Sequence, residues 1–153
     1  MNNTVHAALA PKRWLVVDDD PDVLALTARV LRSLPDQEVV ACANPRRALE
    51  LLTVEPESFE HLVTDFLMPE LNGCELARRA RTRAPHLRVL LISAGGFEAE
   101  VVANAGLDAF LPKPFRAEDL LGAVQILQMR LDKRPRRRMQ QVNSESFQLS
   151  PRS

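Results

Sequence analysis

Acidic, hydroxyl and lysine side chains stand at the ends of four short apolar stretches of this sequence. In chain order they are Asp18 and Asp19, Asp65, Ser93 and Lys113. An apolar run that ends on a polar residue is typical of a buried strand. The carboxyl ends of parallel strands meet at one edge of an open sheet, where ligands bind. The sequence therefore predicts that these side chains gather at the edge of such a sheet.

Three carboxylates at one edge repel one another, which raises their pKa values unless a cation lies among them. Mg²⁺ suits such a site because it takes a few carboxylate oxygens, keeps several waters and works beside phosphate. We interpret Asp65 as a nucleophile that accepts a phosphoryl group as an acyl phosphate. Lys113 and the Ser93 hydroxyl would then contact phosphoryl oxygens and help to neutralise their charge.

Each of these residues also has a purely structural explanation. The acids within residues 18–22 precede a helix and suit its N-terminus. Asp65 suits an Asx turn, Ser93 suits a helix cap, and Lys113 suits a surface position between two prolines. Caps and turns do not account for all four positions in this order. A phosphoryl-transfer site is therefore the favoured interpretation.

Five apolar segments alternate with five amphipathic ones. The expected strands are residues 13–17, 38–42, 59–65, 88–93 and 108–111. The expected helices are residues 21–34, 45–52, 74–83, 97–105 and 117–130. Strands that alternate with helices indicate a parallel sheet covered on both faces, joined by right-handed crossovers. We predict an α/β fold with a five-stranded parallel sheet in the flavodoxin-like order 2-1-3-4-5.

The charge is unevenly distributed along the 153 residues. Residues 1–132 hold 14 Lys and Arg against 19 Asp and Glu, a net −5, whereas residues 133–153 hold 6 against 1, a net +5. The length suits one domain. We expect a flexible leader over 1–11, a folded domain over 12–131, and a basic, polar, disordered tail over 132–153.

The cysteines and the chain's N-terminal residues show neither a metal site nor a targeting segment. Cys42 and Cys74 are far apart and fit no metal-ligand spacing, and residues 1–11 lack the basic start of a secretory signal. No apolar run reaches membrane-spanning length, which predicts no membrane partner. A cytoplasmic location is the resulting expectation.

Four motifs together resemble those of the response-regulator receiver domain of two-component signalling. They are Leu15-Val16-Val17-Asp18-Asp19-Asp20, Val63-Thr64-Asp65-Phe66-Leu67-Met68-Pro69-Glu70-Leu71-Asn72-Gly73, Leu91-Ile92-Ser93-Ala94 and Leu111-Pro112-Lys113-Pro114-Phe115. The resemblance covers residues 12–131, and the last two motifs are similar to receivers of hybrid sensor kinases. It implies a single-domain response regulator, a phosphoprotein of a phosphorelay.

The resemblance also implies the residues of the phosphorylation site. Asp65 would be the phosphoacceptor. Asp18 and Asp19 would hold Mg²⁺ together with Asp65 and the backbone carbonyl of Leu67. Leu67 itself is apolar where some relatives carry a polar residue that influences dephosphorylation, so the phosphate lifetime is left open.

Three further residues are implied to carry the response. Ser93 and Lys113 would bind the phosphoryl group. Phe110 occupies the position of an aromatic switch that turns inward when the Ser93 loop closes on phosphate. The surface of the last two helices and the fifth strand would rearrange with it. Phe110 has no hydroxyl, so such a switch would work by packing alone.

The resemblance implies partners rather than turnover of a substrate. A histidine kinase or a histidine phosphotransfer protein would supply the phosphoryl group, and a downstream protein would read the changed surface. The domain would be no enzyme beyond self-phosphorylation and slow self-dephosphorylation. The cognate kinase, the output target and a phosphorylation-linked homodimer are left open by the sequence.

Two alternatives remain beside this interpretation. The acids after the first strand are also similar to those of haloacid dehalogenase phosphatases, with Asp18 as nucleophile and Asp20 as general acid. Asp22 then stands where Thr or Val is expected. The other alternative is a receiver-like interaction module that is never phosphorylated and binds nucleic acid through its basic tail.

Overall fold

A computed structural model describes residues 12–95 and 105–129 of the chain. Its strands are β1 (Lys12–Val17), β2 (Gln37–Cys42), β3 (His61–Asp65), β4 (Arg88–Ser93) and β5 (Ala109–Pro112). Its helices are α1 (Pro21–Arg32), α2 (Pro45–Val54), α3 (Gly73–Arg83) and α5 (Ala117–Met129).

Three expectations from the sequence fall on other parts of the chain. The leader of residues 1–11 and the tail of residues 132–153 lie outside the described residues. So does the helix expected over residues 97–105, apart from Ala105, which is in a turn. In the part that is described, no helix is long and apolar enough to cross a membrane.

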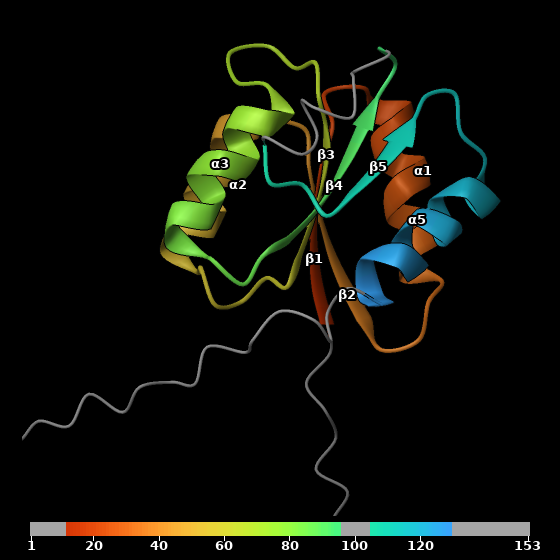
Figure 1. The fold of residues 1–153 in the computed structure, drawn as a ribbon, viewed down its shortest axis with the longest axis horizontal. Helices are drawn as coiled ribbons and strands as arrows, with labels where there is room; N and C mark the ends of the chain where they lie inside the picture. Colours follow the sequence, from red (N-terminus) through yellow and green to blue (C-terminus); the bar gives the residue numbers. More distant parts are fainter. Residues whose placement is uncertain (1–11, 96–104, 130–153) are drawn as a thin grey trace, which may run out of the picture.

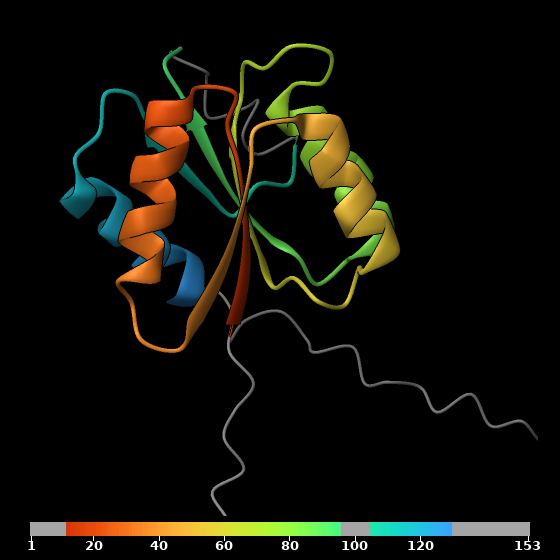
Figure 2. The ribbon, with the colours of Figure 1, turned by 180° about the vertical axis from the view of Figure 1, so that it is seen from behind.

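The five strands are all parallel and lie in the order β2-β1-β3-β4-β5. This confirms the predicted flavodoxin-like order. Helices α2 and α3 cover one face of the sheet, and α1 and α5 cover the other (Figure 1). The view from behind shows the same two layers with the twisted sheet between them (Figure 2). All strands therefore end at one edge of the sheet.

Side-chain caps fix where the first three helices begin. Asp20, Asn44 and Asn72 each accept hydrogen bonds from backbone N–H groups in the first turn of α1, α2 and α3, respectively. Pro21 and Pro45 are the first residues of α1 and α2, where the missing N–H costs nothing. The acids and asparagines before these helices thus start each helix directly after a strand or loop.

Two separate apolar cores lie on either side of the sheet. In β1, Leu15 and Val17 belong to the core beneath α2 and α3. Trp14 and Val16, which alternate with them, belong to the core beneath α1 and α5. Successive side chains of a strand point to opposite faces, so an uninterrupted apolar strand supplies both cores.

β3 begins at His61, two residues later than the sequence predicts. Phe59 is fully buried and lies in the core beneath α2 and α3, where the Arg13 guanidinium covers its ring at 4.6 Å. The backbone of Glu60 makes the contact to β1, by donating to the Arg13 carbonyl at 3.0 Å. The apolar character of Phe59 therefore reflects core packing before the strand, and not the strand itself.

β5 begins one residue later than predicted, directly after Asp108. Its carboxylate accepts hydrogen bonds from the Val89 backbone N–H at 2.9 Å and from Arg81 at 2.6 Å. Asp108 is buried, so its charge requires this partner. The pair joins α3 to the start of β5 across β4.

A buried histidine stacks on the one tryptophan of the chain. The rings of His61 and Trp14 lie 4.0 Å apart at 13°. Neither ring nitrogen of His61 has a hydrogen-bond partner among the described residues. Burial, together with the positive charges of Lys12 and Arg88, lowers the pKa of His61 to about 3. His61 is therefore neutral in the folded protein at ordinary pH.

Replacing His61 with phenylalanine is expected to reduce the loss of stability that occurs as the pH falls. Below pH 6.5 the unfolded chain protonates this histidine and the folded protein does not, so stability falls as pH falls towards 3. The slope is about 1.4 kcal/mol per pH unit. The free energy of unfolding, measured in urea, should fall between pH 7 and pH 5 by about 2 kcal/mol more in the natural protein than in His61→Phe. Equal losses in both proteins would contradict this.

Candidate functional site

The predicted site residues lie along the carboxyl edge of the sheet. Asp18 and Asp19 follow β1, Asp65 ends β3, Ser93 ends β4 and Lys113 follows β5. Asp18, Asp65 and Ser93 are buried, whereas Asp19 is exposed.

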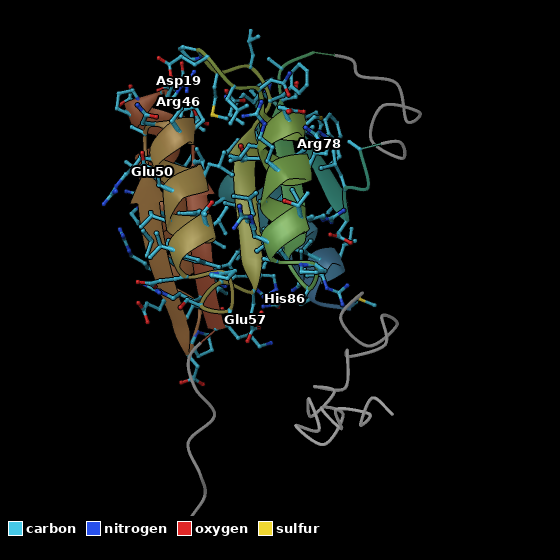
Figure 3. The ribbon with its side chains drawn as sticks, turned by 90° about the vertical axis from the view of Figure 1, so that its left-hand side faces the viewer. Asp19, Arg46, Glu50, Glu57, Arg78 and His86 are labelled. Atoms are coloured by element: carbon cyan, nitrogen blue, oxygen red, sulfur yellow. The ribbon has the colours of Figure 1, made fainter. Side chains whose placement is uncertain are left out.

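The edge can be located in the view of Figure 3. Asp19 lies there at the upper end of the molecule with Arg46, the second residue of α2. His86 and Glu57 lie at the opposite end. The site thus occupies the end of the molecule at which the helices α1 and α2 begin.

Three carboxylates form a cluster at this edge. One oxygen from each of Asp18, Asp19 and Asp65 lies within 4.8 Å of the others. The pKa of Asp18 is raised to about 6, mainly by burial and also by the nearby charge of Asp65, while a hydrogen bond from the Asp20 backbone and the charge of Lys113 oppose the shift. Hard oxygen ligands at this spacing fit a divalent cation such as Mg²⁺, whose charge would offset the repulsion.

Lys113 places an ammonium group beside the carboxylate cluster. Its Nζ lies 3.1 Å from Asp65 Oδ1 and 3.5 Å from Asp18 Oδ2. Burial alone would lower the pKa of Lys113, but the hydrogen bond to Asp65 and the charges of both carboxylates raise it overall. Lys113 therefore stays protonated and holds a positive charge directly beside the Asp65 carboxylate.

Backbone contacts hold Asp65 in place at the end of β3. Asp65 pairs with Ile92 in β4, and the next residue, Phe66, donates to the Ile92 carbonyl at 2.8 Å. Gly73 then donates to the Phe66 carbonyl at 2.8 Å, which returns the chain to the strand end. A Cβ atom on Gly73 would lie 2.1 Å from the Asp65 carbonyl oxygen. In the sequence Gly73 is only the last residue of a motif. In the structure its lack of a side chain lets the start of α3 approach the end of β3 closely.

The other three predicted site residues, Ser93, Leu67 and Phe110, differ in their contacts and exposure. The Ser93 hydroxyl accepts from the Gly95 backbone at 3.2 Å, and its carbonyl accepts from the Lys113 backbone at 2.8 Å. The Leu67 side chain is 76% exposed. Phe110 is half-buried on β5, beside Leu91 of β4. The structure thus joins Ser93 to Lys113 through the backbone.

Asp20 has a structural role that bears on the phosphatase alternative. Its Oδ1 accepts from the backbone N–H groups of Asp22 at 2.9 Å and Val23 at 3.4 Å, which caps α1. Asp18, the nucleophile of that alternative, belongs to the acidic cluster instead. The pair of acids two positions apart that a haloacid dehalogenase would use is therefore divided between a metal-type cluster and a helix cap.

Comparisons with known proteins agree with this fold. The sequence model of the response regulator receiver domain matches residues 14–125. The response regulator MprA of Mycolicibacterium vanbaalenii is 38% identical over 120 residues, which are 76% of this chain and 50% of the relative. The putative two-component response regulator ARR21 of Arabidopsis thaliana is 31% identical over 106 residues, which are 69% of this chain and 17% of the relative. The chain thus spans half or less of the length of these curated relatives.

Solved structures show the same architecture. A CheY-like response regulator receiver domain protein from Methanospirillum hungatei is 29% identical, with a TM-score of 0.69 over 80% of this chain and 95% of that chain. A response regulator receiver domain protein from Clostridium thermocellum, 24% identical, has the same TM-score over the same shares and supports the fold alone. The chain belongs to the response regulator receiver domain family of two-component signalling.

Proposed function

We propose that Asp65 accepts a phosphoryl group from a phosphohistidine, borne by a histidine kinase or a histidine phosphotransfer protein. The observation that carries the proposal is the position of Asp65 itself. Its carboxylate is buried at the strand end, close to Asp18 and Asp19, and has the Lys113 ammonium at 3.1 Å. This arrangement places positive charge where the charge of a transferring phosphoryl group must be offset.

In the proposed transfer, an Asp65 carboxylate oxygen attacks the phosphorus atom of the phosphohistidine. The phosphorus–oxygen bond forms as the phosphorus–nitrogen bond breaks, and the bonding electrons return to the imidazole, which takes up a proton. Asp18, Asp19, Asp65 and the Leu67 carbonyl would hold Mg²⁺, which when bound supplies positive charge to the phosphoryl oxygens. Lys113 moves from carboxylate partners to a phosphoryl oxygen.

The output of the proposed switch is a change in protein contacts. The Ser93 hydroxyl leaves the Gly95 backbone and donates to a phosphoryl oxygen, which draws the loop after β4 towards Asp65. Phe110, on the neighbouring strand β5, repacks inward, and a downstream protein reads the altered surface. The domain over residues 12–131 acts as a phosphoacceptor and not as an enzyme with its own substrate.

Phosphorylation of the whole chain tests this function. The protein is incubated with Mg²⁺ and a small-molecule phosphodonor, and its intact mass is measured. We expect a gain of one phosphoryl group that is absent in Asp65→Asn and when Mg²⁺ is removed. Asp36→Asn is the matched control, since Asp36 lies at the other end of β2 from the site and has a φ of 56°, which asparagine tolerates.

The outcomes separate the candidate functions. Equal phosphorylation of Asp65→Asn and the natural protein would overturn the assignment of Asp65. Turnover of a generic phosphate ester that is lost in Asp18→Asn but kept in Asp65→Asn would instead support the phosphatase alternative.

A further inference from the structure

A groove that the phosphorylation chemistry does not use lies between β5 and α5. Its volume is about 720 Å³, and apolar and acidic side chains line it. Ala109 and Ile126 supply apolar surface, and Ile126 is 51% exposed. Glu118 and Asp119 stand on its α5 side, and among the described residues neither forms a salt bridge. The groove therefore offers apolar surface beside two negative charges that have no salt-bridge partner in the described part of the chain.

The charge of this surface is of one sign. Between Ala117 and Met129, α5 contains two acidic residues and no basic one. Asp119 also accepts from the Arg116 backbone at 2.8 Å, which caps the helix without neutralising the carboxylate. Asp108, in the groove lining, is already paired with Arg81. Glu118 and Asp119 are thus the groove's charges that remain for a ligand.

Gly122 opens the α5 wall of the groove. A glycine inside a helix costs about 0.5–1 kcal/mol relative to alanine. Such a cost is usually explained by close packing or a positive φ, but a Cβ atom on Gly122 would meet nothing within 4 Å, and its φ is not in the left-handed region. The fold does not account for this glycine, whereas close approach of a second chain segment to the groove would.

We propose that the basic segment of residues 133–138 of this same chain binds the β5–α5 groove. It contains five basic residues, which are Lys133, Arg134, Arg136, Arg137 and Arg138. It begins four residues after Met129, where α5 ends. From there, Glu118 lies about 16 Å back along the helix axis. An extended chain of nine residues spans up to about 30 Å, so the segment reaches both acids.

Charge and connection favour this occupant over others. The segment carries the positive charge that Glu118 and Asp119 lack, in a chain whose net charge is −5 before residue 133 and +5 after it. A short connection also gives the segment an effective concentration of the order of millimolar, so even a weak contact is populated. The bound segment would cover the surface beside Phe110 and compete with any protein that docks there.

Nuclear magnetic resonance of the full chain tests the proposal. Amide shifts of the natural protein are compared with those of a variant in which the five basic residues of 133–138 are replaced by glutamine. We expect differences at the groove residues 108–112 and 118–126 and none in α2. Added salt, from about 50 mM to about 500 mM, should move the natural protein towards the variant, because exposed ion pairs are screened.

Single substitutions show which residues bind the segment. Glu118→Gln should reduce occupancy about two- to fivefold, the effect of one exposed ion pair. Glu50→Gln, on α2 across the sheet, is the matched control and should change nothing (Figure 3). Gly122→Leu should fill the groove and reproduce the shifts of the glutamine variant.

Two results would overturn the proposal. Identical groove amides in the natural protein and the glutamine variant would show that the segment does not bind. Shifts that disappear on dilution would show that a second copy occupies the groove instead. The proposal is independent of phosphorylation, since Asp65→Asn should leave these shifts unchanged.

Discussion

Replacing Asp18 with asparagine is expected to stabilise the metal-free protein at neutral pH and to abolish its response to Mg²⁺. The folded protein keeps a proton on Asp18 up to a pKa of about 6, whereas the unfolded chain releases it near 3.8. The free energy of unfolding therefore falls as pH rises from 4 to 6, and the full penalty is present at pH 7.5. Asparagine removes the charge and with it on the order of 2 kcal/mol of this penalty.

The same substitution removes one of the proposed Mg²⁺ ligands. Thermal unfolding with and without Mg²⁺ at pH 7.5 should show a higher melting temperature for the natural protein in Mg²⁺, and no Mg²⁺ effect for Asp18→Asn. Asp22→Asn is the control, because Asp22 is exposed in the first turn of α1 and lies outside the carboxylate cluster. A variant that is less stable than the natural protein without Mg²⁺ would contradict the electrostatic account.

Gly73→Ala is expected to destabilise the protein by about 3 kcal/mol or more. The added methyl group would lie 2.1 Å from the Asp65 carbonyl oxygen and 3.0 Å from the Leu91 side chain. Rotation of a side chain cannot relieve a clash with backbone, so either the start of α3 or the end of β3 has to move. Asp65 is the last residue of β3, and a displacement of about 1 Å can slow a positioned reaction about 100-fold.

Chemical denaturation and the rate of phosphorylation measure the two effects of Gly73→Ala. Gly122→Ala is the control for the change of residue type, since its Cβ meets nothing within 4 Å. That variant should gain about 0.5–1 kcal/mol in stability and be phosphorylated at the natural rate. Equal stability of the two variants would show that the close contact at Gly73 carries no cost.

The order of elements was predictable because local signals agree along the chain. Prolines and the capping residues before them mark the helix starts at Pro21 and Pro45, and uninterrupted apolar runs mark strands that are buried on both faces. The grouping of Asp18, Asp65 and Lys113 followed from topology alone, because parallel strands end at one edge. The spacing of these residues along the sequence does not give the distances between their side chains, such as the 3.1 Å between Lys113 and Asp65.

Features that depend on contacts distant in sequence were not predictable. Arg81 and Asp108 are 27 residues apart, and neither local sequence predicts that they form a pair in the interior. β5 starts directly after Asp108, one residue later than predicted. His61 lies within the strand expected over residues 59–65, but its role as a neutral core residue stacked on Trp14 depends on a contact that the sequence does not show.

The division of the interior into two cores has an evolutionary consequence. Leu15 and Val17 face one core, Trp14 and Val16 face the other, and the sheet separates them. Substitutions in cores that share no side chain have nearly additive effects on stability. A lineage can therefore remodel the α1–α5 layer to suit new partners while the α2–α3 layer, which starts beside Asp65, retains its packing. Signalling partners can diverge in this way without renewed selection on the edge that holds Asp65.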